Sequence, residues 1–153
     1  MPRLLLIAHC PSDNTARLRD AVIAGASHPD IQGIELVVKA PLAAGPEDVL
    51  AADALILGST ENFGTMAGRL KDFFERIYYP CLEQTQGKPY ALYVRAGNDG
   101  RGTIASVEKI VTGLRWKAVA APLRMAGDFD EGFIAQCQEL GMTLAAGLEA
   151  GIF

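Results

Sequence analysis

Five short hydrophobic runs recur along the chain, separated by segments with a different periodicity. Their residues are apolar almost continuously, rather than at every second position, which is typical of strands that are covered on both faces. These runs predict strands at residues 4–8, 34–39, 54–58, 90–96 and 117–123.

The segments between the runs carry apolar residues at helical spacing. In four of them the apolar positions recur at i, i+3, i+4 and i+7, which predicts amphipathic helices through residues 18–25, 66–77, 104–114 and 134–148. The segment 40–53 is different, because Pro41 and Pro46 leave room for only about one helical turn at residues 47–51.

Alternating strands and helices determine the expected fold class. Successive strands joined by helices pair in parallel through right-handed crossovers. The pattern therefore predicts an α/β fold with a three-layer, doubly wound sheet of five parallel strands. The length of 153 residues suits one domain that spans residues 1–153.

Composition and charge exclude several classes of protein. A content of 50% hydrophobic and 21% charged residues argues against disorder. The net charge of −4 repels phosphate backbones and anionic lipid surfaces, so we expect neither nucleic acid nor a membrane as partner. The three cysteines, Cys10, Cys81 and Cys137, are far apart and form no CxxC motif, which argues against a disulfide framework or a metal site and favours the cytoplasm.

Candidate chemistry lies in the loops that follow the first, third and fourth strands. Ligands of open parallel sheets bind beyond the carboxyl ends of the strands, where the strand order reverses. The first loop, residues 10–15, combines hydroxyl and amide side chains with the free N–H groups of a helix start, which predicts a phosphate site. The alternative is that Ser12 or Asn14 only caps the helix.

The other two loops suit a flat ring. In residues 59–66, Phe63 stands among small polar residues beside Gly64 and could line one face of such a ring; the alternative is a helix cap with a core phenylalanine. In residues 96–102, three glycines allow close approach to a ligand, and the alternative is a plain surface turn.

These loops together resemble those of flavodoxin-like proteins, and among them the NAD(P)H-dependent FMN reductases and quinone reductases. Cys10, Ser12 and Thr15 match the three hydroxyl positions of the family's Thr-x-Thr-Gly-x-Thr phosphate loop, with Asp13 at the glycine. Cys10 is a weaker donor than a hydroxyl, and Asp13 brings a negative charge. The most specific likeness lies in residues 47–58 followed by 62–76, and the resemblance covers almost the whole chain.

The resemblance implies the strand order 2-1-3-4-5, with the first loop around the phosphate of FMN and the other two beside its ring. The implied cofactor-binding residues are Cys10, Ser12, Asp13, Asn14, Thr15, Ser59, Thr60, Glu61, Asn62, Phe63, Gly64, Ala96, Gly97, Asn98 and Gly102. The implied activity is an FMN-dependent oxidoreductase that passes a hydride from NAD(P)H through FMN to a quinone or similar small-molecule acceptor. The cofactor carries the chemistry, so no catalytic side chain is expected. Relatives often form homodimers or homotetramers.

Two alternatives stay open, namely a flavodoxin-type electron carrier without turnover of its own and a flavodoxin-like domain that no longer binds flavin. A low-molecular-weight phosphatase is disfavoured because six residues, rather than five, separate Cys10 from Arg17. The G-x-G-x-x-A pattern at residues 100–105 follows the fourth strand and lacks a later acidic partner, so a dinucleotide fold is disfavoured too. We interpret His9 as a hydrogen-bonded packing residue and His28 as part of a helix-terminal turn.

Overall fold

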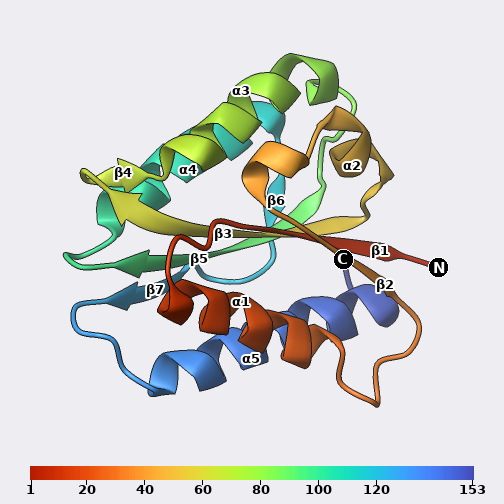
Figure 1. Ribbon diagram of the computed structural model, residues 1–153. Coiled ribbons are helices and arrows are strands. Elements are labelled where there is room, and N and C mark those ends of the chain that lie inside the picture. Colours follow the sequence, from red (N-terminus) through yellow and green to blue (C-terminus); the bar gives the residue numbers. More distant parts are fainter.

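The computed structural model describes residues 1–153 as one sheet with helices on both faces (Figure 1). Its strands are β1 (Arg3–Ala8), β2 (Glu35–Lys39), β3 (Ala54–Asn62), β4 (Thr65–Met66), β5 (Pro89–Ala96), β6 (Lys117–Ala118) and β7 (Leu123–Ala126). Its helices are α1 (Asp13–Ala26), the 3-10 turn η1 (Pro41–Ala43), α2 (Pro46–Ala51), α3 (Gly68–Cys81), α4 (Arg101–Leu114) and α5 (Gly132–Glu149).

The sheet confirms the expected topology. The parallel strands lie in the order β2-β1-β3-β5, with β6 and β7 both pairing with β5 beyond it. This is the order 2-1-3-4-5 once β6 and β7 are taken as two parts of the fifth strand. Helices α1 and α5 cover one face, and α2, α3 and α4 cover the other (Figure 1).

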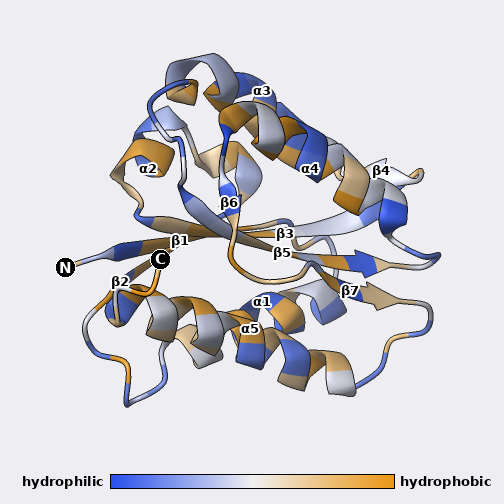
Figure 2. Cartoon of the chain, turned by 180° about the vertical axis from the view of Figure 1, so that it is seen from behind, coloured by the Kyte–Doolittle hydropathy of each residue, from blue (hydrophilic) through white to orange (hydrophobic).

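Successive residues of each central strand point to opposite faces of the sheet and pack into two separate cores. Leu4 and Leu6 of β1 pack with α1 and α5, whereas Leu5 and Ile7 pack with α3 and α4. All four side chains are fully buried. Burial on both faces explains why the strand is apolar at every position, and in Figure 2 the central strands are mostly hydrophobic while α3 and α4 alternate hydrophobic and hydrophilic residues.

The third strand is longer than predicted. The apolar run ends at Gly58, but β3 continues to Asn62. Thr60 pairs with Arg95 of β5, and the last two residues of β3 pair with the short antiparallel strand β4. Backbone pairing extends the strand past its apolar part, so the predicted second loop is a β-hairpin.

The predicted strand at residues 117–123 is wrong in its bounds. Tyr90 pairs with Ala118 and Tyr93 pairs with Leu123, so residues 119–122 oppose only residues 91–92 of β5. The inserted residues leave the ladder, and the strand resumes as β7 up to Ala126.

The crossover between β2 and β3 agrees with the prediction. Helix α2 starts at Pro46, where a missing N–H costs no helical hydrogen bond, and it ends at Ala51. The 3-10 turn η1 precedes it, and the carbonyl oxygens of Pro41 and Ala44 accept hydrogen bonds from Arg76 of α3. None of the helices has the combination of length and apolar character that crossing a bilayer requires.

Candidate functional site

The three predicted loops converge at one edge of the sheet. Ala8, the last residue of β1, pairs with Gly58 of β3, and Thr60 of β3 pairs with Arg95 of β5. The chain turns from β1 toward β2 in one direction and later places β3 on the other side of β1. The loops therefore flank the point where strand order reverses, which is the usual ligand position in open α/β sheets.

The first loop is held by a reciprocal cap. The Thr15 amide donates to the Ser12 Oγ at 3.2 Å, and the Ser12 amide donates to the Thr15 Oγ1 at 3.0 Å. The two hydroxyl oxygens lie 2.9 Å apart, and Thr15 is buried. The capping alternative is thus correct for Ser12, and both hydroxyls hold the loop in shape.

Two amides at the start of α1 stay free. Neither the Asp13 nor the Asn14 N–H donates to an acceptor in the protein, and both residues are exposed. Free N–H groups at the positive end of a helix dipole attract an anion. The loop can therefore hold a phosphoryl group through its backbone, while the Asp13 carboxylate opposes it.

Cys10 lies half-buried at the start of this loop. Burial raises the pKa of its thiol, and the neighbouring Arg19 partly offsets this. The thiol is therefore protonated near neutral pH, and it is a weak donor at a position where the related phosphate loop carries a hydroxyl.

The second loop is a tight hairpin with an aromatic tip. Asn62 pairs with Thr65, and the two residues between them, Phe63 and Gly64, have positive φ values of 52° and 79°. Two successive positive φ values define a type I′ turn, which matches the twist of a β-ribbon. Phe63 is fully exposed, so the alternative of a core phenylalanine is wrong.

Polar side chains form hydrogen bonds at the base of this hairpin. The Ser59 hydroxyl accepts a hydrogen bond from the Ala67 amide at 3.0 Å and donates to the Thr60 carbonyl oxygen at 2.8 Å. The Thr60 hydroxyl donates to the Asn62 Oδ1 at 2.8 Å, and Glu61 pairs with β4 through the ladder. These four predicted site residues form the base of the hairpin, with Phe63 at its tip.

The third loop is short and open. Ala96 ends β5 in the core and its carbonyl oxygen accepts from the Gly127 amide at 2.9 Å, while Gly97 and Asn98 are exposed. Nothing lies within 4 Å of the position that a Cβ on Gly97 would take. Gly102 is different, because it belongs to α4 and packs against the hairpin backbone at Gly64. The glycine at position 102 makes room for the hairpin, and its assignment to the cofactor site stays a prediction.

A cationic cluster beside the first loop escaped the sequence analysis. The Arg17 guanidinium lies 5.4 Å from the centre of the Phe129 ring, and Arg95 lies 5.7 Å from the same ring. Arg17 also donates to the Asn14 Oδ1 at 3.3 Å, and Arg95 to the Met125 carbonyl oxygen at 3.1 Å. The sequence carried one sign of this cluster: Arg95 is a charged residue near the end of the apolar run at residues 90–96.

The two histidines behave differently. The His28 Nδ1 accepts from the Asp30 amide at 3.1 Å in the turn after α1, as expected. His9 is only partly buried, and its ring has no hydrogen-bond partner in the protein, so its interpretation as a hydrogen-bonded packing residue is wrong. Burial and the nearby Arg69 lower the pKa of His9, which keeps the ring neutral at pH 7.

Comparison with solved structures shows the same fold. A flavodoxin from the domain Archaea superposes with a TM-score of 0.80 at 16% identity, covering 96% of this chain and 99% of its own. A WrbA-like flavodoxin from Agrobacterium tumefaciens gives a TM-score of 0.74 at 18% identity, covering 98% of this chain and 99% of its own.

Sequence comparison shows the family. A flavodoxin of Aquifex aeolicus is 30% identical over 112 residues, which are 73% of this chain and 60% of that relative's length. The family model of the NADPH-dependent FMN reductases matches residues 15–129, so the match starts at the end of the first loop and contains the second and third. The chain therefore belongs to the NADPH-dependent FMN reductase family and has the flavodoxin-like fold.

Proposed function

We propose that this protein binds FMN at the converging loops and serves as an oxidoreductase that takes a hydride from NAD(P)H and delivers it to a quinone or similar small acceptor. One observation carries the proposal. The free amides of Asp13 and Asn14, the exposed ring of Phe63 and the open turn at Gly97 lie on three loops of one sheet edge. Family membership supports the same cofactor.

The phosphate end of FMN suits the start of α1. The Asp13 and Asn14 amides would donate to the phosphoryl oxygens, and the Ser12–Thr15 cap keeps these amides pointing out of the helix. Arg17 is paired with Glu131, so Arg95 is the guanidinium of this cluster that brings uncompensated positive charge. This charge partly offsets the Asp13 carboxylate, which the resemblance identified as a departure from glycine.

The ring end of FMN suits the hairpin and the third loop. Phe63 offers an exposed aromatic face on a backbone that its own turn makes rigid, and the amides and carbonyl groups around Gly97 are open to the edge of a planar ring. Bound FMN supplies the hydride-accepting and hydride-donating chemistry. The residues of the chain bind it, orient it and shield one side from water.

A titration tests the cofactor, and an assay tests the activity. Binding to the protein should quench the fluorescence of FMN. FMN should also raise the melting temperature of the protein, because it binds only the folded chain. With FMN bound, the protein should oxidise NADPH or NADH when a benzoquinone is present. Saturating FMN that changes neither fluorescence nor melting temperature would rule out the proposal.

An electron carrier is the second candidate, and the likeness to the Aquifex aeolicus flavodoxin favours it. Such a protein would bind FMN in the same way but would not oxidise a nicotinamide nucleotide. FMN binding without any NAD(P)H oxidation, across a panel of quinones, would therefore identify the carrier. The third candidate, a domain without flavin, is supported by the exposed Asp13 carboxylate and would leave FMN unbound.

A further inference from the structure

A cavity lies next to the proposed flavin site, at the carboxyl ends of β1 and β2. Its volume is about 330 Å³, which is in the range of small-molecule sites. Its charged or titratable lining consists of His9, Arg19, Lys39 and Arg69, besides the neutral thiol of Cys10. No aspartate or glutamate lines it, although the whole chain has a net charge of −4.

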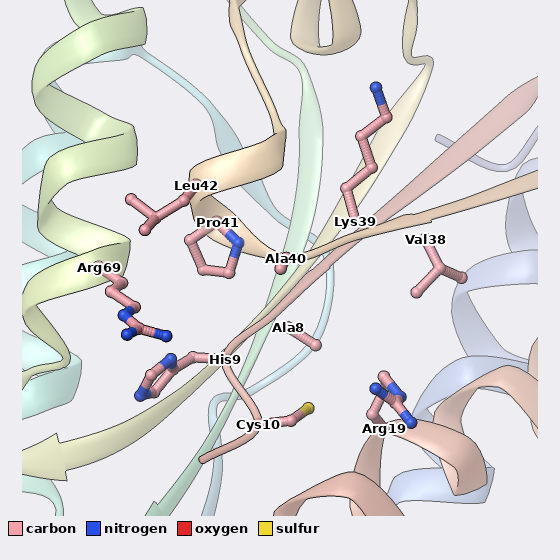
Figure 3. Close-up of a pocket in the computed structure, with 10 residues that line it drawn as sticks. All are labelled: Ala8, His9, Cys10, Arg19, Val38, Lys39, Ala40, Pro41, Leu42 and Arg69. Atoms are coloured by element: carbon pink, nitrogen blue, oxygen red, sulfur yellow. The ribbon is translucent and has the colours of Figure 1, made fainter.

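The basic residues that line this cavity come from three separate layers of the fold. Arg19 belongs to α1 on one face of the sheet, Arg69 to the first turn of α3 on the other face, and Lys39 to the end of β2 between them. Figure 3 shows the Arg69 guanidinium beside the His9 ring, and the Cys10 sulfur pointing toward Arg19 on the other side of β1. Side chains from both faces of the sheet can line one cavity here because β2 is the edge strand and ends at Lys39.

Arg69 is the charge that nothing in the protein compensates. Arg19 pairs with Asp20 at 3.0 Å, and Lys39 pairs with Asp48 at 2.8 Å and points away from the cavity (Figure 3). Arg69 takes part in none of the ion pairs of the structure. The adjacent His9 ring also lacks a hydrogen-bond partner, so both groups are free to receive a ligand.

The remaining lining is apolar. Pro41 and Leu42 of η1 lie on the same side of β1 as Arg69 and His9, and Val38 near the end of β2 lies on the side of Arg19 (Figure 3). Leu42 is 56% exposed and Val38 is 39% exposed, so a ligand would cover hydrophobic surface that now faces water. An apolar wall beside uncompensated cations suits a molecule with one anionic end and one apolar end.

We propose that this cavity binds a small organic oxyanion, with its carboxylate or phosphate group between Arg69 and His9 and its apolar part against Pro41 and Leu42. The site is separate from the proposed flavin site, because only Cys10 is shared with the three loops. It does not depend on the proposed oxidoreductase activity.

The histidine ring offers a direct readout. The chain has only two histidines, so proton NMR can follow His9 in the cavity with His28 as internal reference. An anion next to the ring favours its protonated form, so binding should raise the pKa of His9, while the ligand should leave the His28 resonances in place. The charged group beside the His9 ring is Arg69 of α3, while Arg19 of α1 lies across β1 and Lys39 of β2 points away. Protonation of His9 adds a second positive charge next to Arg69, so the bound anion should be held more tightly as the pH falls through the pKa of His9.

The experiment uses the folded protein with saturating FMN, and again without FMN. Benzoate and phenyl phosphate are the probes, which distinguish a carboxylate from a phosphate, and benzyl alcohol is the neutral control. Both anions should raise the pKa of His9, and benzyl alcohol should not. Arg69→Gln should weaken their binding about tenfold or more, because a charge-assisted contact is lost. Lys109→Gln on the exposed side of α4 removes the same charge and should have no effect.

Three results would overturn the proposal. The first is a His9 resonance that neither anion moves at tens of millimolar concentration. The second is binding that Arg69→Gln and Arg19→Gln leave unchanged while both variants stay folded by circular dichroism. The third is binding that vanishes with FMN and responds to Asp13→Asn instead, since it would then belong to the first loop. A protein that binds the anions but not FMN would contradict the proposed function and would leave the proposal for this cavity standing.

Discussion

A methyl group on Gly102 would overlap the carbonyl oxygen of Gly64. This close approach fixes the aromatic hairpin to the first turn of α4, and it joins the second and third loops into one unit. The position of the Phe63 hairpin therefore depends on a glycine in the first turn of α4.

Gly102→Ala should push the hairpin away from α4 and destabilise the protein by about 1–3 kcal/mol, as overpacking does. FMN binding should weaken as well, because the hairpin moves. Gly68→Ala is the matched control, since it makes the same change in the first turn of α3 where nothing lies within 4 Å. The control should be neutral or slightly stabilising through helix propensity. Melting curves and FMN titrations of the two variants would check this; equal stability of both would contradict it.

Phe63→Asn should change stability and cofactor affinity in opposite directions. Phe63 has a φ of 52°, which costs a bulky side chain about 1 kcal/mol and suits asparagine, the preferred residue of an Asn-Gly type I′ turn. The melting temperature should rise by about 2–4 °C. FMN affinity should fall about tenfold if the ring contacts the flavin. Tyr79→Asn, which alters an exposed tyrosine on α3, serves as the control and should leave FMN affinity as it is.

Asp13→Asn should tighten the binding of FMN about threefold to tenfold at low salt, because a carboxylate no longer opposes the phosphate. Riboflavin, which lacks the phosphate, should bind the variant and the parent equally. The unliganded variant should be slightly less stable, since Asp13 favours the positive end of α1. Isothermal titration with both flavins would measure this, and an equal gain for riboflavin would show that the phosphate does not lie at the first loop.

Alkaline pH should destabilise the fold through Cys137. Burial raises the pKa of this thiol from 9.0 to about 12. Between about pH 9 and 12 the thiol ionises in the unfolded chain but not in the folded one. Its contribution to the free energy of unfolding is therefore fully present below pH 9 and is lost as the pH rises. The decline amounts to up to about 1.4 kcal/mol per pH unit. Denaturant unfolding of the parent and of Cys137→Ala between pH 7 and 11 would test this. The variant should show the shallower decline, and parallel curves would contradict the assignment.

The amino-acid sequence by itself determined the layers of this protein. Strands buried on both faces must be apolar at every position, so runs such as residues 4–8 and 54–58 identify the parallel sheet. Helices that cover one face must carry an apolar stripe, as in residues 66–77. Pro46, which starts the helix, identified the short helix α2. The alternation of strands and helices along the chain also predicts which loops lie at the carboxyl edge of the sheet.

Only the tertiary structure decided what those loops do. The hairpin at Phe63 forms through backbone pairing, which polar residues such as Thr60 and Asn62 join without any periodic signal. Gly102 proved to be a packing position, because a close contact between Gly102 and Gly64 crosses 38 residues of sequence. The insertion at residues 119–122 depends on register with β5. In each case the deciding energy comes from contacts between residues far apart in the chain, and local patterns carry no record of such contacts.

The cationic cavity shows the same limit most clearly. Arg19 and Arg69 are solvated helix residues when their own helices are considered alone. They line one cavity because α1 and α3 lie on opposite faces of a sheet whose edge strand ends at Lys39. Sequence determines which side chains are charged, and the end of the edge strand determines which of them meet.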